Sequence, residues 1–188
     1  MKKVASRSAL ALVVSSLAAA AYIETVHAAD GFRKVRCDAP IIPALIGVNS
    51  SASEPVVRIE ARHKAIGLQH LGAEIVDDGP GMPISTINWR VCGRVVVVLD
   101  VRNVWQDAVE LPGSSHEAPA FSTASCTVGG RKVEGSVVGV FVERPREGER
   151  VLPVRAGWRI DLKAGRFVPL DGPAICATDG IDSPNLSR

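Results

Sequence analysis

Residues 84–99 read ISTINWRVCGRVVVVL, and this stretch decides the fold. Its first part, residues 84–92, alternates imperfectly between apolar and polar side chains, which is the period of a β-strand with one buried face. Gly93 and Arg94 then form a tight connection, and residues 95–99 are apolar at every position. A strand that is apolar on both faces lies inside a sheet and is covered from both sides. The stretch therefore predicts two adjoining strands, the second of them central.

Further strands are expected towards the C-terminus. Apolar or alternating runs of the kind found in strands occupy residues 125–128, 137–142, 158–162 and 166–170. Gly129 and Gly130 suit a type I′ hairpin turn, because that turn needs a positive φ at both central residues. Pro169 cannot donate a hydrogen bond to a neighbouring strand, which places its strand at a sheet edge or ends it there. Residues 112–120 have the composition of a loop.

Helices are expected before this strand-rich region. A short one can span residues 40–46, and a better one can begin at Ser53, whose side chain can accept the hydrogen bond of an N-cap. Apolar or partly apolar side chains fall on one face of the second helix, at Val56, Ile59, His63 and Ile66. Gly67 can end that helix. Residues 68–76 are expected to be irregular or to form a short strand.

Together these patterns predict an α+β domain, with N-terminal helices packed on a five- to six-stranded, mostly antiparallel sheet. The domain is expected to span residues 29–176 and to be followed by a frayed tail at 177–188. Strands and helices do not alternate along the chain, which disfavours the dinucleotide-binding folds.

The first 28 residues predict a cleaved secretory signal peptide. Lys2, Lys3 and Arg7 give a positive start, residues 9–23 form an apolar run, and residues 26–28 end in small side chains. The apolar run falls short of the roughly 20 residues that cross a bilayer, so no stable membrane anchor is expected after cleavage. The predicted location is the periplasm or the exterior of the cell.

The charge balance excludes an electrostatic binder of nucleic acid. The chain has 22 basic and 20 acidic residues, and these fall to 19 and 19 when Lys2, Lys3, Arg7 and Glu24 leave with the signal peptide. A nucleic-acid-binding domain would show a clear basic excess. The expected partner is an envelope protein or a small ligand.

Four cysteines lie in the exported part of the chain, at Cys37, Cys92, Cys126 and Cys176. An even number in an exported protein predicts two disulfides, and the wide spacing excludes a CxxC redox pair or a zinc ribbon. Buried free thiols and a reactive cysteine are the alternatives. Three connectivities are possible. We expect Cys37 to pair with Cys92, because they flank the helical portion, and Cys126 with Cys176, because they bracket the later strands.

The best candidate for a catalytic group is His116, in the loop at residues 112–120. Ser114, Ser115 and Glu117 are its neighbours, and an exposed histidine can act as a general base near neutral pH. Asp100 and Asp107 are conceivable orienting carboxylates. A solvated loop histidine is the alternative, because adjacency in sequence does not supply catalytic geometry. The chain lacks the G-x-S-x-G, S-x-x-K, H-E-x-x-H, P-loop and G-x-G-x-x-G motifs of common enzymes.

Two further groups of residues are candidates for binding. Glu60 and His63 form one Glu-x-x-His pair, which is half of a carboxylate-bridged metal motif, and His70 could join them only if the helix continued past Gly67. A buried or helix-capping histidine is the alternative, and no metal or cofactor is expected. Trp105 stands at the polar end of a strand and is the candidate exposed contact, with Arg102 beside it. Trp89 and Trp158 are expected to pack in or near the core.

Three segments carry a resemblance to a known group of proteins. They are IEARHKAIGLQHLGAEI at residues 59–75, INWRVCG at 87–93 and GWRIDLKAGRFVPL at 157–170. Together they resemble a family of uncharacterised small exported bacterial proteins, over most of the chain after the signal peptide. The resemblance implies export and a single compact domain, and it implies no activity and no site residues.

The function predicted from the sequence is that of an exported cell-envelope protein, a non-enzymatic binding or inhibitory module stabilised by disulfides. The alternative is a small hydrolase or transferase with His116 as its general base. A third hypothesis is a metal-binding protein that uses Glu60, His63 and His70.

Overall fold

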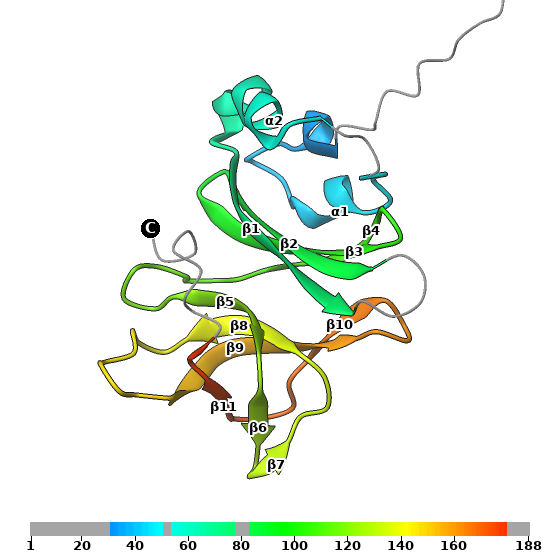
Figure 1. Cartoon of the computed structure of the whole chain (residues 1–188). Coiled ribbons are helices and arrows are strands. Elements are labelled where there is room, and N and C mark those ends of the chain that lie inside the picture. The colour runs from blue at the N-terminus through cyan, green and yellow to red at the C-terminus, as the bar shows by residue number, and fades with distance from the viewer. Residues whose placement is uncertain (1–30, 51–53, 78–82, 180–188) are drawn as a thin grey trace, which may run out of the picture.

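The computed structural model describes residues 31–50, 54–77 and 83–179. Over these residues the chain forms two antiparallel β-sheets and a small helical cap, a name used here for residues 31–50 and 54–67. The helical cap, the first sheet and the second sheet follow one another as three layers (Figure 1). The predicted signal peptide, the Ser53 N-cap and residues 180–188 of the predicted tail lie outside the described residues.

The predicted fold class, helices packed on a single sheet, is wrong, because the protein is mostly β and has two sheets. The helical elements are short: η1 (Gly31–Lys34), α1 (Ile42–Leu45), α2 (Val56–Arg62) and η2 (Lys64–Ile66). The second predicted helix forms only as α2 and η2, and α2 buries none of its side chains fully. An α-helix rises 1.5 Å per residue, so the seven residues of α2 extend only about 10 Å and cannot cover a sheet.

The first sheet is a meander of four strands in chain order. These strands are β1 (Gln69–Asp77), β2 (Ile84–Val91), β3 (Arg94–Val101) and β4 (Val104–Glu110). The two strands predicted from residues 84–99 are confirmed, although Cys92 and Gly93 form the turn, with φ of 53° and 74°, and Arg94 already belongs to β3. Residues 68–76 are expected to be irregular or to form a short strand, and residues 69–77 form the nine-residue strand β1.

The apolar run in β3 has the two buried faces that its sequence predicts. Val95, Val97 and Leu99 belong to the hydrophobic cluster that also takes in residues of the second sheet. Val96 and Val98 belong to the cluster that the first sheet forms with the helical cap. Side chains alternate between the faces of a strand, so β3 contributes to both layers of core.

The second sheet has seven strands, and its spatial order differs from the chain order. The strands are β5 (Ala120–Ala124), β6 (Cys126–Val128), β7 (Arg131–Lys132), β8 (Val137–Phe141), β9 (Val151–Asp161), β10 (Arg166–Pro169) and β11 (Ala174–Ala177). They pair in the order β5-β8-β9-β11-β6-β7, and β10 pairs with β9. Gly129 and Gly130 have the positive φ values of 56° and 76° that their predicted turn requires. Pro169 lies on β10, which pairs along one side only.

Polar side chains connect the two sheets. The Asp107 carboxylate on β4 accepts a hydrogen bond from the Phe167 backbone N–H on β10, at 2.7 Å. Glu74 on β1 accepts hydrogen bonds from the hydroxyls of Ser122 and Thr123 on β5. These contacts fix the first sheet against the second.

Both expected disulfides are present. Cys37 pairs with Cys92 and so ties the helical cap to the turn between β2 and β3. Cys126 pairs with Cys176, and the two residues lie opposite each other on β6 and β11. The first disulfide therefore joins two layers, whereas the second lies inside one sheet.

Candidate ligand-binding cavity

A cavity of about 370 Å³ lies between the helical cap and the face of the first sheet that points away from the second sheet. Strands β1, β2 and β4 form its floor with His70, Ala73, Trp89 and Trp105, among others. The helical cap supplies Phe32 and several smaller side chains from above. The volume falls in the range of about 300–1,000 Å³ that is usual for small-molecule sites.

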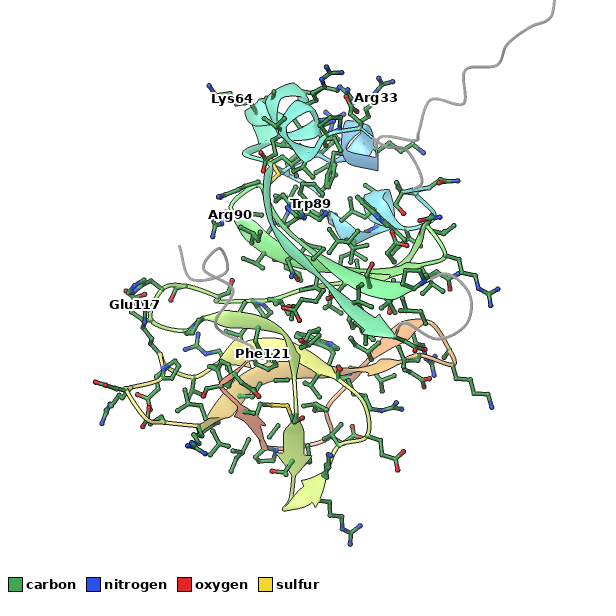
Figure 2. All side chains as sticks on the ribbon, in the orientation of Figure 1. Arg33, Lys64, Trp89, Arg90, Glu117 and Phe121 are labelled. Atoms are coloured by element: carbon green, nitrogen blue, oxygen red, sulfur yellow. A yellow bond between two sulfur atoms is a disulfide. The ribbon has the colours of Figure 1, made fainter. Side chains whose placement is uncertain are left out.

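Three aromatic rings form one wall of the cavity. The ring of Phe32 packs edge-on against Trp89, with centroids 4.9 Å apart, and against Trp105, with centroids 5.4 Å apart. Edge-to-face pairs of this kind are favourable beyond the area that they bury. Figure 2 shows Trp89 between the first sheet and the helical cap. Because the rings hold one another in place, this wall is preformed.

The two indole N–H groups of this wall have no acceptor. Trp89 is 3% exposed and Trp105 is 6% exposed, and neither Nε1 atom has a hydrogen-bond partner among the described residues. Almost all buried polar groups in proteins are hydrogen-bonded, and leaving one unpaired costs about 1–3 kcal/mol. Both Nε1 atoms are closed to solvent, the space of the cavity included, so these unpaired donors belong to the packed layer behind the cavity surface.

Carboxylates near the cavity already have partners within the protein. Glu54, a lining residue, forms an ion pair with Arg62 at the end of α2. Ser50, another lining residue, donates its hydroxyl hydrogen bond to the buried carboxylate of Asp100.

His70 is a lining residue of the cavity, and its imidazole ring can take up a proton. It packs edge-on against Trp89, with centroids 4.8 Å apart. Burial lowers the pKa of His70, and the nearby Glu60 carboxylate opposes this shift only in part. The ring is therefore uncharged at neutral pH.

The prediction that Trp105 is an exposed contact is wrong. Residues 47–50 run along the outer edge of β4 and cover it: the Trp105 backbone N–H donates to the carbonyl oxygen of Val48 at 2.9 Å, and the Gly47 N–H donates to that of Trp105 at 2.8 Å. The helical cap then closes over the ring. Arg102 does not join Trp105 at the cavity; it is exposed in the β3–β4 turn, with φ of 55°.

The structure does not assemble a catalytic group around His116. The side chain is 63% exposed, and its Nε2 atom contacts the guanidinium of Arg144. The Ser115 hydroxyl donates to Glu117 at 2.9 Å and not to the imidazole. Glu117, the neighbour of His116 in the chain, lies at the outer edge of the molecule (Figure 2). Of the suggested orienting carboxylates, Asp107 accepts the Phe167 N–H and Asp100 accepts the Ser50 hydroxyl.

The candidate metal ligands also have other contacts. Glu60 accepts a hydrogen bond from the backbone N–H of His70 at 2.6 Å, and the ring of His63 lies 5.9 Å from that of Phe32. Within residues 31–50, 54–77 and 83–179, no three His, Cys, Asp or Glu side chains gather as a metal site requires.

Sequence reasoning placed Trp89 in the core and did not identify Phe32 or Ala73 as site residues. One signal was available: Trp89 shares a strand face with Val91 and Ile87, and this face belongs to the core layer of the helical cap. Phe32 is far from this strand in sequence, and no local sequence pattern predicts its contact with Trp89.

No helix in the described part of the chain is long and apolar enough to span a membrane. No protein-family model, curated protein or solved structure matches the chain.

Proposed function

We propose that this chain is an exported cell-envelope protein that binds a small molecule in the cavity beneath its helical cap, without catalysing a reaction. The observation that carries the proposal is the cavity of about 370 Å³ with its preformed wall of Phe32, Trp89 and Trp105. Concave, mainly apolar sites with a few polar groups are the usual form of small-molecule sites.

Export is supported by the cysteines. All four form disulfides, and disulfides persist in oxidising compartments outside the cytoplasm. This agrees with the signal peptide predicted from residues 1–28. The Cys37–Cys92 disulfide also has a place in the binding function, because it holds the roof of the cavity against the sheet that forms its floor.

A small ligand fits the site better than a protein partner does. Protein interfaces are built around aromatic anchors that a partner can cover. Here Phe32, Trp89 and Trp105 are at most 6% exposed, so a large flat partner would find little of them to bury. The site is instead a concave cavity beneath the helical cap, which suits a molecule small enough to enter it.

The proposal can be tested with a cavity-blocking substitution. Ala73 lines the cavity from β1, and a phenylalanine side chain at this position would occupy the space of a ligand. We expect a ligand-detected NMR screen of small apolar molecules against the oxidised full-length protein to give binders, and Ala73→Phe to lose them.

The matched control is Ala164→Phe, in the exposed turn between β9 and β10, which should retain the binders. Far-ultraviolet circular dichroism and the unfolding midpoint would establish that both variants fold. A screen without binders, or binders that Ala73→Phe retains, would refute the proposed function.

A further inference from the structure

We infer that the ligand of this cavity is a small, uncharged and apolar molecule, and that a positive charge on the His70 ring opposes its binding. The inference rests on the proposed function. It adds the chemical class of the ligand and the protonation state in which the site accepts it. It follows from three features of the cavity: its apolar lining, the contacts of its polar lining residues and the place of the His70 ring.

The apolar lining favours a ligand without polar groups. Besides the three aromatic rings, the cavity is bordered by Val48, Ile59 and Ile87. Apolar ligand surface buried against such side chains contributes roughly 25 cal/mol per Å² removed from water. A polar group of a ligand would lose its hydrogen bonds to water, and the indole N–H groups packed behind the cavity surface could not replace them.

The carboxylate and the hydroxyl of the lining have partners within the protein. Glu54 forms an ion pair with Arg62, and Ser50 donates its hydroxyl hydrogen bond to Asp100. Aromatic rings attract cations, but a cation in this cavity would compete with Arg62 for the Glu54 carboxylate. No Lys or Arg is among the described lining residues, so an anion would be buried without a counter-charge at neutral pH. An uncharged ligand meets neither obstacle.

The His70 ring lies at the apolar surface that a ligand would cover. It is half-buried and packs edge-on against Trp89, and both residues line the cavity. An apolar ligand would displace water from the ring. Losing water costs a charged imidazolium more than it costs a neutral imidazole. Ligand binding and protonation of His70 should therefore oppose each other.

The charges around His70 leave this coupling in place. Burial already lowers the pKa of His70 in the free protein. Among the described residues, the charge that acts on the ring is the Glu60 carboxylate on α2, and it opposes the effect of burial on this pKa only in part. On β2, Arg90 donates to the side chain of its cross-strand neighbour at 2.6 Å. The ring is therefore neutral at neutral pH, and an apolar ligand should lower its pKa further.

Three probes of similar size test the chemical class. Ethylbenzene is neutral and apolar, benzoate is an anion and phenyltrimethylammonium is a cation. Each would be titrated into the oxidised, ¹⁵N-labelled full-length protein at about pH 7.5, where His70 is neutral, and binding would be followed by NMR. We expect ethylbenzene to bind most tightly, Ala73→Phe to lose it and the control Ala164→Phe to retain it.

A pH titration tests the coupling to His70. The pKa of the ring would be measured by NMR of the imidazole group, without ligand and with excess ethylbenzene, and exposed His116 is the internal reference. We expect the ligand to lower the pKa of His70 and to leave His116 unchanged. By linkage, the affinity for ethylbenzene should be at least about threefold weaker when the His70 ring is charged.

The variant His70→Phe keeps an aromatic ring against Trp89 and removes the titrating group. Its affinity for ethylbenzene should not change with pH over the range in which the wild type loses affinity. Far-ultraviolet circular dichroism would establish that both proteins are folded throughout this range. An equal loss of affinity in His70→Phe and the wild type would overturn the role of His70.

The outcomes distinguish this inference from the proposed function. Tightest binding of benzoate or phenyltrimethylammonium, lost in Ala73→Phe, would overturn the uncharged ligand and leave the binding function standing. A His70 pKa that bound ethylbenzene does not move would overturn the coupling, again without affecting the binding function. If no probe and no molecule of the NMR screen bound, both the inference and the proposed function would fail.

Discussion

The stability of the helical cap and the cavity should depend on pH through His70. Its ring packs on Trp89, and its backbone N–H is held by the Glu60 carboxylate. Burial lowers the pKa of His70 in the folded protein below the ordinary value near 6.5, whereas the unfolded chain keeps that value. The unfolded state therefore takes up the proton first as the pH falls.

This difference sets the sign of a pH dependence. Stability that depends on a neutral His70 is fully present above about pH 6.5 and is lost as the pH falls from there towards the folded pKa. The slope for one proton cannot exceed about 1.4 kcal/mol per pH unit. We expect urea unfolding between about pH 8 and pH 5 to show a smaller loss in His70→Phe than in the wild type. Identical pH profiles would contradict this account of His70.

At the scale of elements, β8 and β9 meet closely through two opposed glycines, Gly139 and Gly157. A Cβ atom on Gly139 would lie 2.5 Å from the carbonyl oxygen of Ala156 and 2.8 Å from the Phe121 ring. A Cβ atom on Gly157 would lie 2.9 Å from the end of the Leu170 side chain, which can rotate away. The backbone of β9 cannot move in the same way.

We therefore expect Gly139→Ala to lower the free energy of unfolding by about 1–3 kcal/mol, the usual cost of overpacking a core. Gly157→Ala, its matched control, should cost less. Chemical denaturation of both variants measures the difference. A loss in Gly157→Ala equal to that in Gly139→Ala would show that the strands are not spaced as described.

The strands were largely predictable from local pattern, but their assembly was not. The apolar run of β3, the turn at Gly129 and the edge position of Pro169 each follow from a property of a few neighbouring residues. Pairing of β11 with both β6 and β9 joins residues far apart in the chain, and no periodicity reveals it. The second helix ends at Gly67 as predicted, with φ of 61°, but its α-helical part is shorter than predicted. The α-helix ends at Arg62, where His63 has φ of −107° and ψ of 23°, and residues 64–66 form only a 3-10 turn.

At the scale of the whole molecule, the two disulfides have different tasks. Cys37 is exposed and joins the helical cap to the first sheet, whereas Cys126 and Cys176 are 2% and 0% exposed in the core of the second sheet. With sequence separations of 55 and 50, the chain-entropy account gives each an upper stabilisation of about 4 kcal/mol.

Removing each disulfide separately should affect stability and ligand affinity in opposite order. Cys126→Ala with Cys176→Ala should cause the larger loss of stability, because it also leaves a gap in the core. Cys37→Ala with Cys92→Ala should cause the larger loss of affinity for a ligand found in the NMR screen, because it frees the roof of the cavity. Unfolding and calorimetric titration of both double variants provide the test. Equal effects of the two on ligand affinity would show that the first disulfide has no part in the site.

The cavity itself could not be predicted from the sequence, because it forms only when the helical cap lies on the first sheet. Its wall combines Phe32 from the helical cap with Trp89 and Trp105 from two strands, and each of these residues is an ordinary core residue in its local context. The sequence drew attention instead to His116, a histidine in a polar loop, which the structure leaves exposed.

The most direct test of the central claim is a crystal structure of the oxidised full-length protein with a small apolar molecule from the NMR screen bound. The account predicts the ligand beneath the helical cap, in the cavity that Phe32, Ala73, Trp89 and Trp105 line. A ligand bound outside the helical cap would contradict it.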